Sequence, residues 1–201
     1  PRRPNRARPF FPSSSTLLPG FEHIPLWRTD LVPFGDAVAP CPGGIWCRHR
    51  DGEGRETGSE LVKAGPAGGF AFTRGGTRSL FRTPGPCRPR LVLLDGPMQA
   101  VCLAALKGHA IATATFAAPG GSWSRAADEA LSALVITSTP REVILAFAPL
   151  PDGSCPSRER CLAVLRDMMP PSSREPVVLE PPPGGWVGAL RAARSPTRDA
   201  A

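Results

Sequence analysis

The sequence predicts an α/β fold, with a parallel sheet of about four strands flanked by helices and preceded by a small antiparallel β meander. Three observations support this prediction. Residues 91–94 form a continuous apolar run, which is typical of a strand covered on both faces. Apolar runs then alternate with segments of helical period, which favours right-handed βαβ units. The earlier residues 40–83 hold short strand-like runs separated by glycine-rich turns.

The first half of the chain divides into an arm and a small domain. Residues 1–20 are rich in Pro, Arg and Ser, so we expect a disordered basic arm. Residues 21–89 are expected to form a small β-rich domain. Its first prolines limit any helix there to a few turns. The turn "RDGEGRE" then joins strands expected at 45–49 and 57–62.

The second half, residues 90–193, is expected to form the α/β domain, followed by a frayed tail at 194–201. Pro97 suits the first turn of a helix, and Ser122 or Ser124 suits the N-cap of the next one. After the strand at 91–94, the expected strands are 110–114, 142–147 and 177–179, and the expected helices follow near Pro97, Ser124, Pro156 and Trp186.

In such folds, ligands bind at the carboxyl ends of the parallel strands. The loops there hold Asp95 and Gly96, then Gly120 and Gly121, and finally Gly153. Glycines let a ligand approach the backbone, and helix N-termini offer amide donors to a phosphate, although ordinary turns explain the same residues. The sequence has no GxGxxG and no GxxxxGK[ST], so neither a dinucleotide site nor a P-loop is supported.

The net charge of +7 makes nucleic acid a candidate partner. Residues 1–89 hold 13 basic and 7 acidic residues, whereas residues 90–201 hold 11 and 10, so attraction to phosphate lies mainly in the first half. The expected phosphate contacts are Arg2, Arg3, Arg6, Arg8, Arg48, Arg50 and Arg74. A solvated arginine-rich surface without a partner is the competing explanation, because abundant Arg, Ala, Gly and Pro suggest a GC-rich genome.

The six cysteines are irregularly spaced and accompany no export signal, which argues against a disulfide framework. Cys41, Cys47 and His49, with Cys87, offer a set of zinc ligands, but the spacing lacks a CxxC pair. Buried or incidental thiols are the competing explanation. Cys102 lies on an apolar helix face and is expected in the core.

The sequence predicts no membrane segment. No apolar run approaches the roughly 20 residues that span a bilayer, and no signal-peptide core follows the N-terminus. A cytoplasmic protein is therefore expected. The first residue is Pro1 rather than Met, which indicates a fragment or a processed product.

The order of these loops resembles the Toprim domain of primases, topoisomerases and related nucleases. "LVLLDGPMQAVCLAALKG" is similar to its first motif, and "REVILAFAPLPDGSCPSRERCLAVLRDM" to its second. "VVLEPPPGGWVGALRA" resembles the closing segment of the primase-like branch. The preceding "GIWCRHRDGEGRETGSELV" and "GGFAFTRGGTRSLFR" look like the small domain that accompanies Toprim in plasmid mobilisation and primase-like proteins. The resemblance covers residues 43–193.

The resemblance also implies where the acidic site should lie. Asp95 stands where the family has Glu, and it is shorter by one methylene. Ala148 and Leu150 stand where the family has the Asp-x-Asp pair that holds Mg²⁺, and neither side chain offers an oxygen ligand. Asp152 lies two positions beyond the pair and is the remaining candidate partner of Asp95 for a metal.

In the closing segment, Gly185 and Gly188 stand at acidic positions of the family around a retained Trp186, which is expected in the core. The resemblance thus implies a degenerate Toprim-like, nucleic-acid-associated module with lost or impaired catalysis. It implies no cofactor, or Mg²⁺ if activity remains, and DNA or RNA and further replication or mobilisation domains as partners. Two alternatives stay open: an active Mg²⁺-dependent nuclease or primase using Asp95 and Asp152, and a structural interaction module without nucleic-acid contact.

Overall fold

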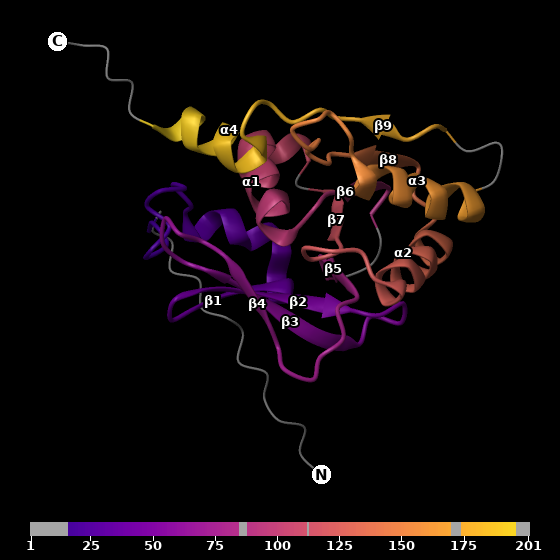
Figure 1. Cartoon of the computed structure of the whole chain (residues 1–201), viewed down its shortest axis with the longest axis horizontal. Helices are drawn as coiled ribbons and strands as arrows, with labels where there is room; N and C mark the ends of the chain where they lie inside the picture. The colour runs from indigo at the N-terminus through magenta and orange to yellow at the C-terminus, as the bar shows by residue number, and fades with distance from the viewer. Residues whose placement is uncertain (1–15, 85–87, 112, 170–173, 196–201) are drawn as a thin grey trace.

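A nine-stranded mixed sheet lies between two groups of helices in the computed structural model, which describes residues 16–84, 88–111, 113–169 and 174–195 (Figure 1). The strands follow the order β4-β3-β2-β5-β7-β6-β8-β9, with β1 beside β2. Their bounds are β1 Val38–Cys41, β2 Gly44–Arg50, β3 Glu56–Lys63, β4 Phe70–Phe72, β5 Leu80–Arg82, β6 Arg90–Leu93, β7 Thr115–Ala118, β8 Glu142–Leu145 and β9 Val177–Val178.

The helices connect and cover the parallel strands. Their bounds are α1 Pro97–Lys107, α2 Arg125–Ser138, α3 Pro156–Met168 and α4 Gly185–Arg194, with 3-10 segments η1 Arg28–Ala37 and η2 Gly108–Ala110. Ser124 is the N-cap of α2, where its side chain accepts a hydrogen bond from the Ala127 amide at 3.1 Å. Pro97 and Pro156 occupy the first turns of α1 and α3, as the sequence predicts.

Strands β7, β6, β8 and β9 run parallel, which confirms the predicted sheet. The two faces of β6 explain its uninterrupted apolar sequence. Val92 packs in the cluster that includes α1, α4 and η1. Leu91 and Leu93 pack in the cluster that includes α2 and α3. Since helices cover both faces, alternation with polar residues would place a polar side chain in one of the two cores.

The β-rich half is antiparallel, as predicted, and it continues the same sheet. β2 pairs with β3, with Cys47 opposite Glu60, and β5 pairs with both β2 and β7. Phe81 of β5 faces Ala118 of β7, so the two halves of the chain share one set of backbone hydrogen bonds. The sequence pattern changes near residue 89, but one sheet continues across that point.

Residues 16–20 and Arg194 are more ordered than the composition predicts. Leu18 is buried in the core, and Leu17 forms a bridge with Trp27, so the prediction of a disordered arm is wrong for residues 16–20. Two adjacent apolar residues, Leu17 and Leu18, are enough to hold the backbone against the rest of the fold within this polar segment. Residues 1–15 lie outside the described residues. At the other end, Arg194 is the last residue of α4 rather than part of a tail.

The predicted strand at 110–114 is also wrong, since the strand at this place is β7, Thr115–Ala118. The chain between α1 and β7 forms a 3-10 segment and a turn instead. Gly108 adopts a φ of +51°, η2 follows, and the Ala114 amide donates to the Ile111 carbonyl in a further turn. Only then is the backbone extended beside β6.

Within the residues that the structure describes, no helix is both long enough and apolar enough to cross a bilayer.

Candidate functional site

A pocket of about 280 Å³ lies where β6 ends and α1 begins, beside β3 and β4. We call it the strand-end pocket, and define it by the residues that line it: Glu60, Val62, Gly69, Phe70, Asp95, Gly96, Pro97, Met98, Gln99 and Gly121. It combines the ligand edge of the parallel sheet with residues from the antiparallel half. Of the sequence-predicted site residues, it brings together Asp95, Gly96 and Gly121.

Asp95 connects the ends of two parallel strands. Its Oδ2 accepts a hydrogen bond of 2.7 Å from the Ala148 amide, in the loop that follows β8. Burial raises the pKa of the Asp95 carboxyl, and this hydrogen bond partly offsets the effect. The carboxylate therefore stabilises the contact between two loops, and it is costly to ionise where it lies.

Replacing Asp95 with asparagine is expected to raise stability at neutral pH. A raised pKa means that the folded state keeps this proton to higher pH, so stability falls as pH rises from below 3.8 through the raised pKa. Asparagine keeps an oxygen acceptor for Ala148 without the buried charge. Urea unfolding should show the variant to be the more stable at neutral pH, with the difference shrinking below pH 3.8.

Asp152→Asn is the matched control, because the pKa of Asp152 is shifted in the opposite direction. Hydrogen bonds from Ser154 lower the pKa of the Asp152 carboxyl, so its contribution is present above the ordinary pKa and is lost in acid. Asp152→Asn should therefore lower stability slightly at neutral pH. A clear loss of stability in Asp95→Asn at neutral pH would show that the charge itself is needed.

The loop after β8 forms a closed turn on its own. The Leu150 amide donates to the Ser154 carbonyl at 2.8 Å, and Gly153 has a φ of +83°. Asp152 is exposed and accepts from the Ser154 amide at 2.9 Å and from its hydroxyl at 2.6 Å. Asp152 is not among the residues that line the strand-end pocket, so Asp95 and Asp152 have separate partners.

No group of three or more His, Cys, Asp or Glu side chains placed to hold a metal occurs among the described residues. This includes the proposed zinc ligands, of which Cys87 lies outside the description. Burial raises the pKa of the Cys47 thiol well above its usual range, whereas zinc binds the thiolate. His49 directs Nδ1 to the Ser79 carbonyl at 3.2 Å. Cys102 is buried in the core, as predicted.

A buried histidine–glutamate pair beside the pocket was not foreseen from the sequence. His49 is fully buried and Glu60 is 4% exposed. His49 Nε2 and Glu60 Oε2 lie 3.5 Å apart, and neither atom makes a hydrogen bond to the described residues. The backbone of Gly120 is held against this pair with a φ of +69°. The strand alternation that buries Ile45 and Cys47 also turns His49 inward, and that was the available signal.

Gly120 thus has a packing role rather than the ligand approach that its loop suggested. A Cβ on Gly120 would lie 2.2 Å from His49 Cε1 and 2.7 Å from Glu60 Oε2. Gly121, with a φ of +85°, packs beside the Phe70 ring and reaches the pocket wall. Both glycines therefore pack against the antiparallel half of the sheet.

The predicted phosphate-binding arginines are placed very differently. Arg48 pairs with Glu56 at 3.4 Å and Arg50 with Asp36 at 3.1 Å. Arg74 is exposed and makes no ion pair with the described residues. The arginines of the first 15 residues lie outside the description.

Arg78 was missed by the sequence analysis. Its guanidinium carbon lies 5.5 Å from the centroid of the Phe70 ring and 5.1 Å from that of Phe72. One of its nitrogens donates to the Gly120 carbonyl at 3.4 Å. No ion pair joins it to a carboxylate in the described part of the chain. The β-rich half thus presents an arginine beside the strand-end pocket, with its charge uncompensated locally.

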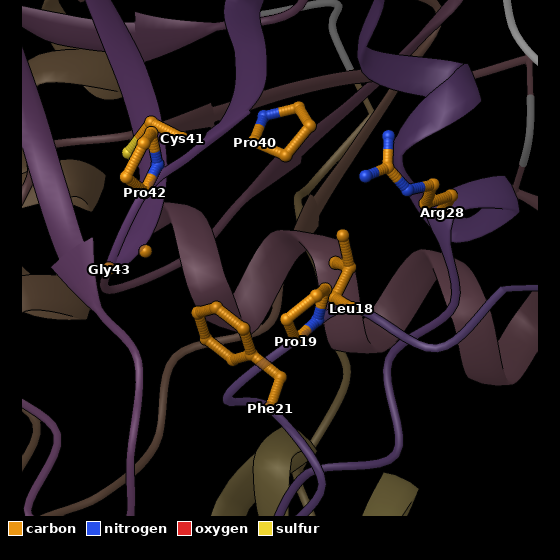
Figure 2. A pocket seen from close by; sticks show the side chains of 9 residues that line it. Leu18, Pro19, Phe21, Arg28, Pro40, Cys41, Pro42 and Gly43 are labelled. Carbon is orange, nitrogen blue, oxygen red and sulfur yellow. The ribbon is translucent and has the colours of Figure 1, made fainter.

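A second pocket, of about 350 Å³, lies at the turn between β1 and β2 (Figure 2). Its wall is formed mainly by proline and apolar side chains, among them Leu18, Pro19 and Phe21. The Arg28 guanidinium faces it from the start of η1 (Figure 2). None of its lining residues is a carboxylate or a histidine, and among them the Cys41 thiol is the one group able to act as a nucleophile or a metal ligand.

Neither a model of a known protein family nor a curated protein matches the sequence. Among solved structures, the chain is similar to the E. coli primase catalytic core, with a TM-score of 0.50 and 16% identity over 82% of this chain and 56% of that one. A structure of the DnaG catalytic core gives a TM-score of 0.52 and 17% identity over 82% and 55%. A DNA primase domain from Pseudomonas aeruginosa gives 0.50 and 16% over 75% and 47%.

These similarities concern the fold, because the identities are low. The chain spans about half the length of the primase structures it matches. Its parallel sheet and flanking helices agree with the predicted resemblance. The chain therefore has a Toprim-like fold of the kind found in primase catalytic cores.

Proposed function

We propose that this chain is a nucleic-acid-associated module on a Toprim-like fold, in which metal-dependent catalysis has been lost. The observation that carries the proposal is the hydrogen bond from the Ala148 amide to Asp95. Through this hydrogen bond, a backbone amide that follows β8 occupies the carboxylate that follows β6. The residue that makes this contact, Ala148, stands where the resemblance expects the first metal-binding aspartate.

The ligand requirements of Mg²⁺ support the proposed loss of metal-dependent catalysis. Mg²⁺ requires near-octahedral oxygen ligands, and it neutralises the charge that develops in phosphoryl transfer. Ala148 and Leu150 supply no oxygen from their side chains. Asp152 accepts two hydrogen bonds from Ser154 in its own turn. Asp95 alone is an insufficient ligand set, so we propose that Asp95 is a structural remnant of the acidic site.

The distribution of charge supports nucleic acid as the partner. Most of the excess positive charge lies in residues 1–89. In this half, Arg74 is exposed and Arg78 lies beside the strand-end pocket, and neither pairs with a described carboxylate. The similarity to primase catalytic cores points the same way. Because the chain spans about half of those structures, we propose that further domains of a cytoplasmic replication or plasmid-mobilisation protein complete it.

Salt-dependent binding of single-stranded DNA tests this function. Each phosphate contact releases counterions, so log affinity should fall linearly with log salt concentration. Arg74→Ala should reduce that slope by about 1, in EDTA as well as in Mg²⁺. Arg166→Ala is the matched control, because Arg166 is also an exposed arginine, lies on α3 and should leave the slope unchanged.

Three results would contradict the proposal. Undetectable binding at low salt would favour a structural interaction module. Equal effects of the two arginine variants would show that net charge matters rather than the position of the arginine. Strand cleavage or primer synthesis that requires Mg²⁺ and disappears in Asp95→Asn would restore the enzyme.

A further inference from the structure

We propose that the strand-end pocket binds one unpaired nucleobase, with guanine preferred. This inference rests on the proposed function and names the group that the module recognises. In it, the carboxylate of Glu60 and the Oδ1 atom of Asp95, to which the Ala148 amide does not donate, accept hydrogen bonds from the Watson–Crick edge of the base. Phe70 provides the surface on which the base stacks, and Arg78 faces the attached phosphate.

Glu60 provides the first observation, because it is a buried carboxylate whose Oε2 atom has His49 at ion-pair distance but accepts no hydrogen bond within the described part of the chain. The side chain is 4% exposed and lines the pocket, yet its Oε2 accepts no hydrogen bond from the described residues. His49 Nε2 is 3.5 Å away. A buried acceptor without a donor destabilises the fold, so such groups are rare in folded proteins unless a water, an ion or a ligand completes them. The Oε2 atom itself is enclosed beside His49 and Gly120, so a ligand with N–H groups would meet the other oxygen of this carboxylate, on the side of Glu60 that lines the pocket.

Phe70 provides the second, independent observation. It belongs to the edge strand β4 and is 53% exposed, which is unusual for a phenylalanine that lies beside a pocket. The Arg78 guanidinium lies 5.5 Å from the ring centroid, and Gly121 packs near the ring edge. Proteins that bind single strands use exposed aromatic rings of this kind, since every base has a face that can stack.

The charges around the pocket favour a nucleotide over a simple cation or a basic side chain. Two carboxylates line the pocket, whereas Arg78 lies at its rim over Phe70. A cationic ligand would meet the carboxylates but would also meet the Arg78 charge. A nucleotide carries N–H donors at one end and a phosphate at the other, and this matches the order of charges in the site.

The polar groups also favour one base. Carboxylates accept hydrogen bonds, so they select a base edge with several donors, as guanine has at N1 and N2. Gln99 adds a donor, because its Oε1 accepts from the Trp186 amide at 3.1 Å, which leaves its Nε2 amide hydrogens for the guanine O6. Thymine offers a single donor. The volume of about 280 Å³ is near the lower end of small-ligand sites and suits one base rather than a pair.

Fluorescence anisotropy with short labelled DNA strands tests this inference. The strands are oligothymidines that carry one central guanine, one central thymine or one abasic site, and free dGMP serves as competitor. The guanine strand should bind about tenfold more tightly than the thymine and abasic strands. Glu60→Gln and Phe70→Leu should each remove most of that preference while the dependence on salt remains.

The variants include their own controls. Phe70→Leu changes a half-exposed side chain, and thermal unfolding of Glu60→Gln confirms that it folds. Val32→Ala alters another exposed apolar residue away from the pocket and should leave the preference unchanged.

The outcomes separate the two proposals. Binding of dGMP alone, without binding of any strand, would support the pocket as a site for free nucleotides and contradict the proposed function. Competition by dGMP together with a guanine preference in strands supports both proposals. Equal binding of the guanine, thymine and abasic strands, with normal salt dependence, would overturn the inference and leave the proposed function standing.

Discussion

Replacing Trp186 with alanine is expected to lower the free energy of unfolding by about 4 kcal/mol. Trp186 lies in the first turn of α4 and is buried between that helix and the sheet, in the cluster that includes α1. Its indole Nε1 donates to the Ala146 carbonyl at 2.9 Å, just past the end of β8. Its loss removes a large apolar side chain and leaves a buried carbonyl without its donor. Urea unfolding monitored by far-UV circular dichroism measures the change.

Trp186→Phe separates the two contributions. Phenylalanine fills most of the space but donates no hydrogen bond, so the expected loss is about 2 kcal/mol. Equal losses for the phenylalanine and alanine variants would assign the whole effect to the hydrogen bond. A loss below about 1 kcal/mol for alanine would contradict the packing of α4 onto the sheet.

Gly120→Ala should destabilise the fold by about 3 kcal/mol, through overpacking and a strained backbone together. The new methyl group would lie 2.2 Å from His49 Cε1, in a place with no free volume. The φ of +69° adds a penalty for any residue with a side chain. The shift in the thermal midpoint, together with the urea midpoint, measures the effect.

Gly43→Ala is the matched control for Gly120→Ala. Gly43 has a φ of +82°, and a Cβ there would meet no atom within 4 Å. This variant should lose about 1 kcal/mol from backbone strain alone. Equal losses at the two glycines would show that the buried His49–Glu60 pair adapts to the methyl group. The same result would argue against a rigid pocket wall.

The parallel half of the fold could be predicted because its physical signal is local. The apolar run from Leu91 to Leu94 is uninterrupted since helices cover both of its faces. Ser124 and Pro156 mark the starts of helices by capping and by backbone geometry. The strand after α1 was misplaced because Ile111 and Thr113 are β-branched, yet the chain leaving α1 forms a 3-10 segment and a turn before it becomes extended.

The candidate site was less predictable because it depends on contacts between distant residues. The sequence shows a carboxylate at Asp95, but only the folded chain shows that the Ala148 amide, 53 residues later, donates to it. Alternation along β2 turns His49 inward, whereas placing Glu60 beside it requires the register of β2 and β3, including a bulge at His49 and Arg50. Arg78 and Phe70 meet for the same reason.

Titration with Mg²⁺, followed through backbone amide NMR signals, tests the central claim that this strand-end site no longer holds a catalytic metal. The Ala148 amide is the reporter, because a metal on Asp95 would compete for the Oδ2 atom to which it donates. We expect no saturable shift of the Ala148 or Gly96 signals in millimolar Mg²⁺, and the same spectra with Asp95→Asn apart from local differences. Saturable shifts of both signals that Asp95→Asn abolishes would contradict the claim.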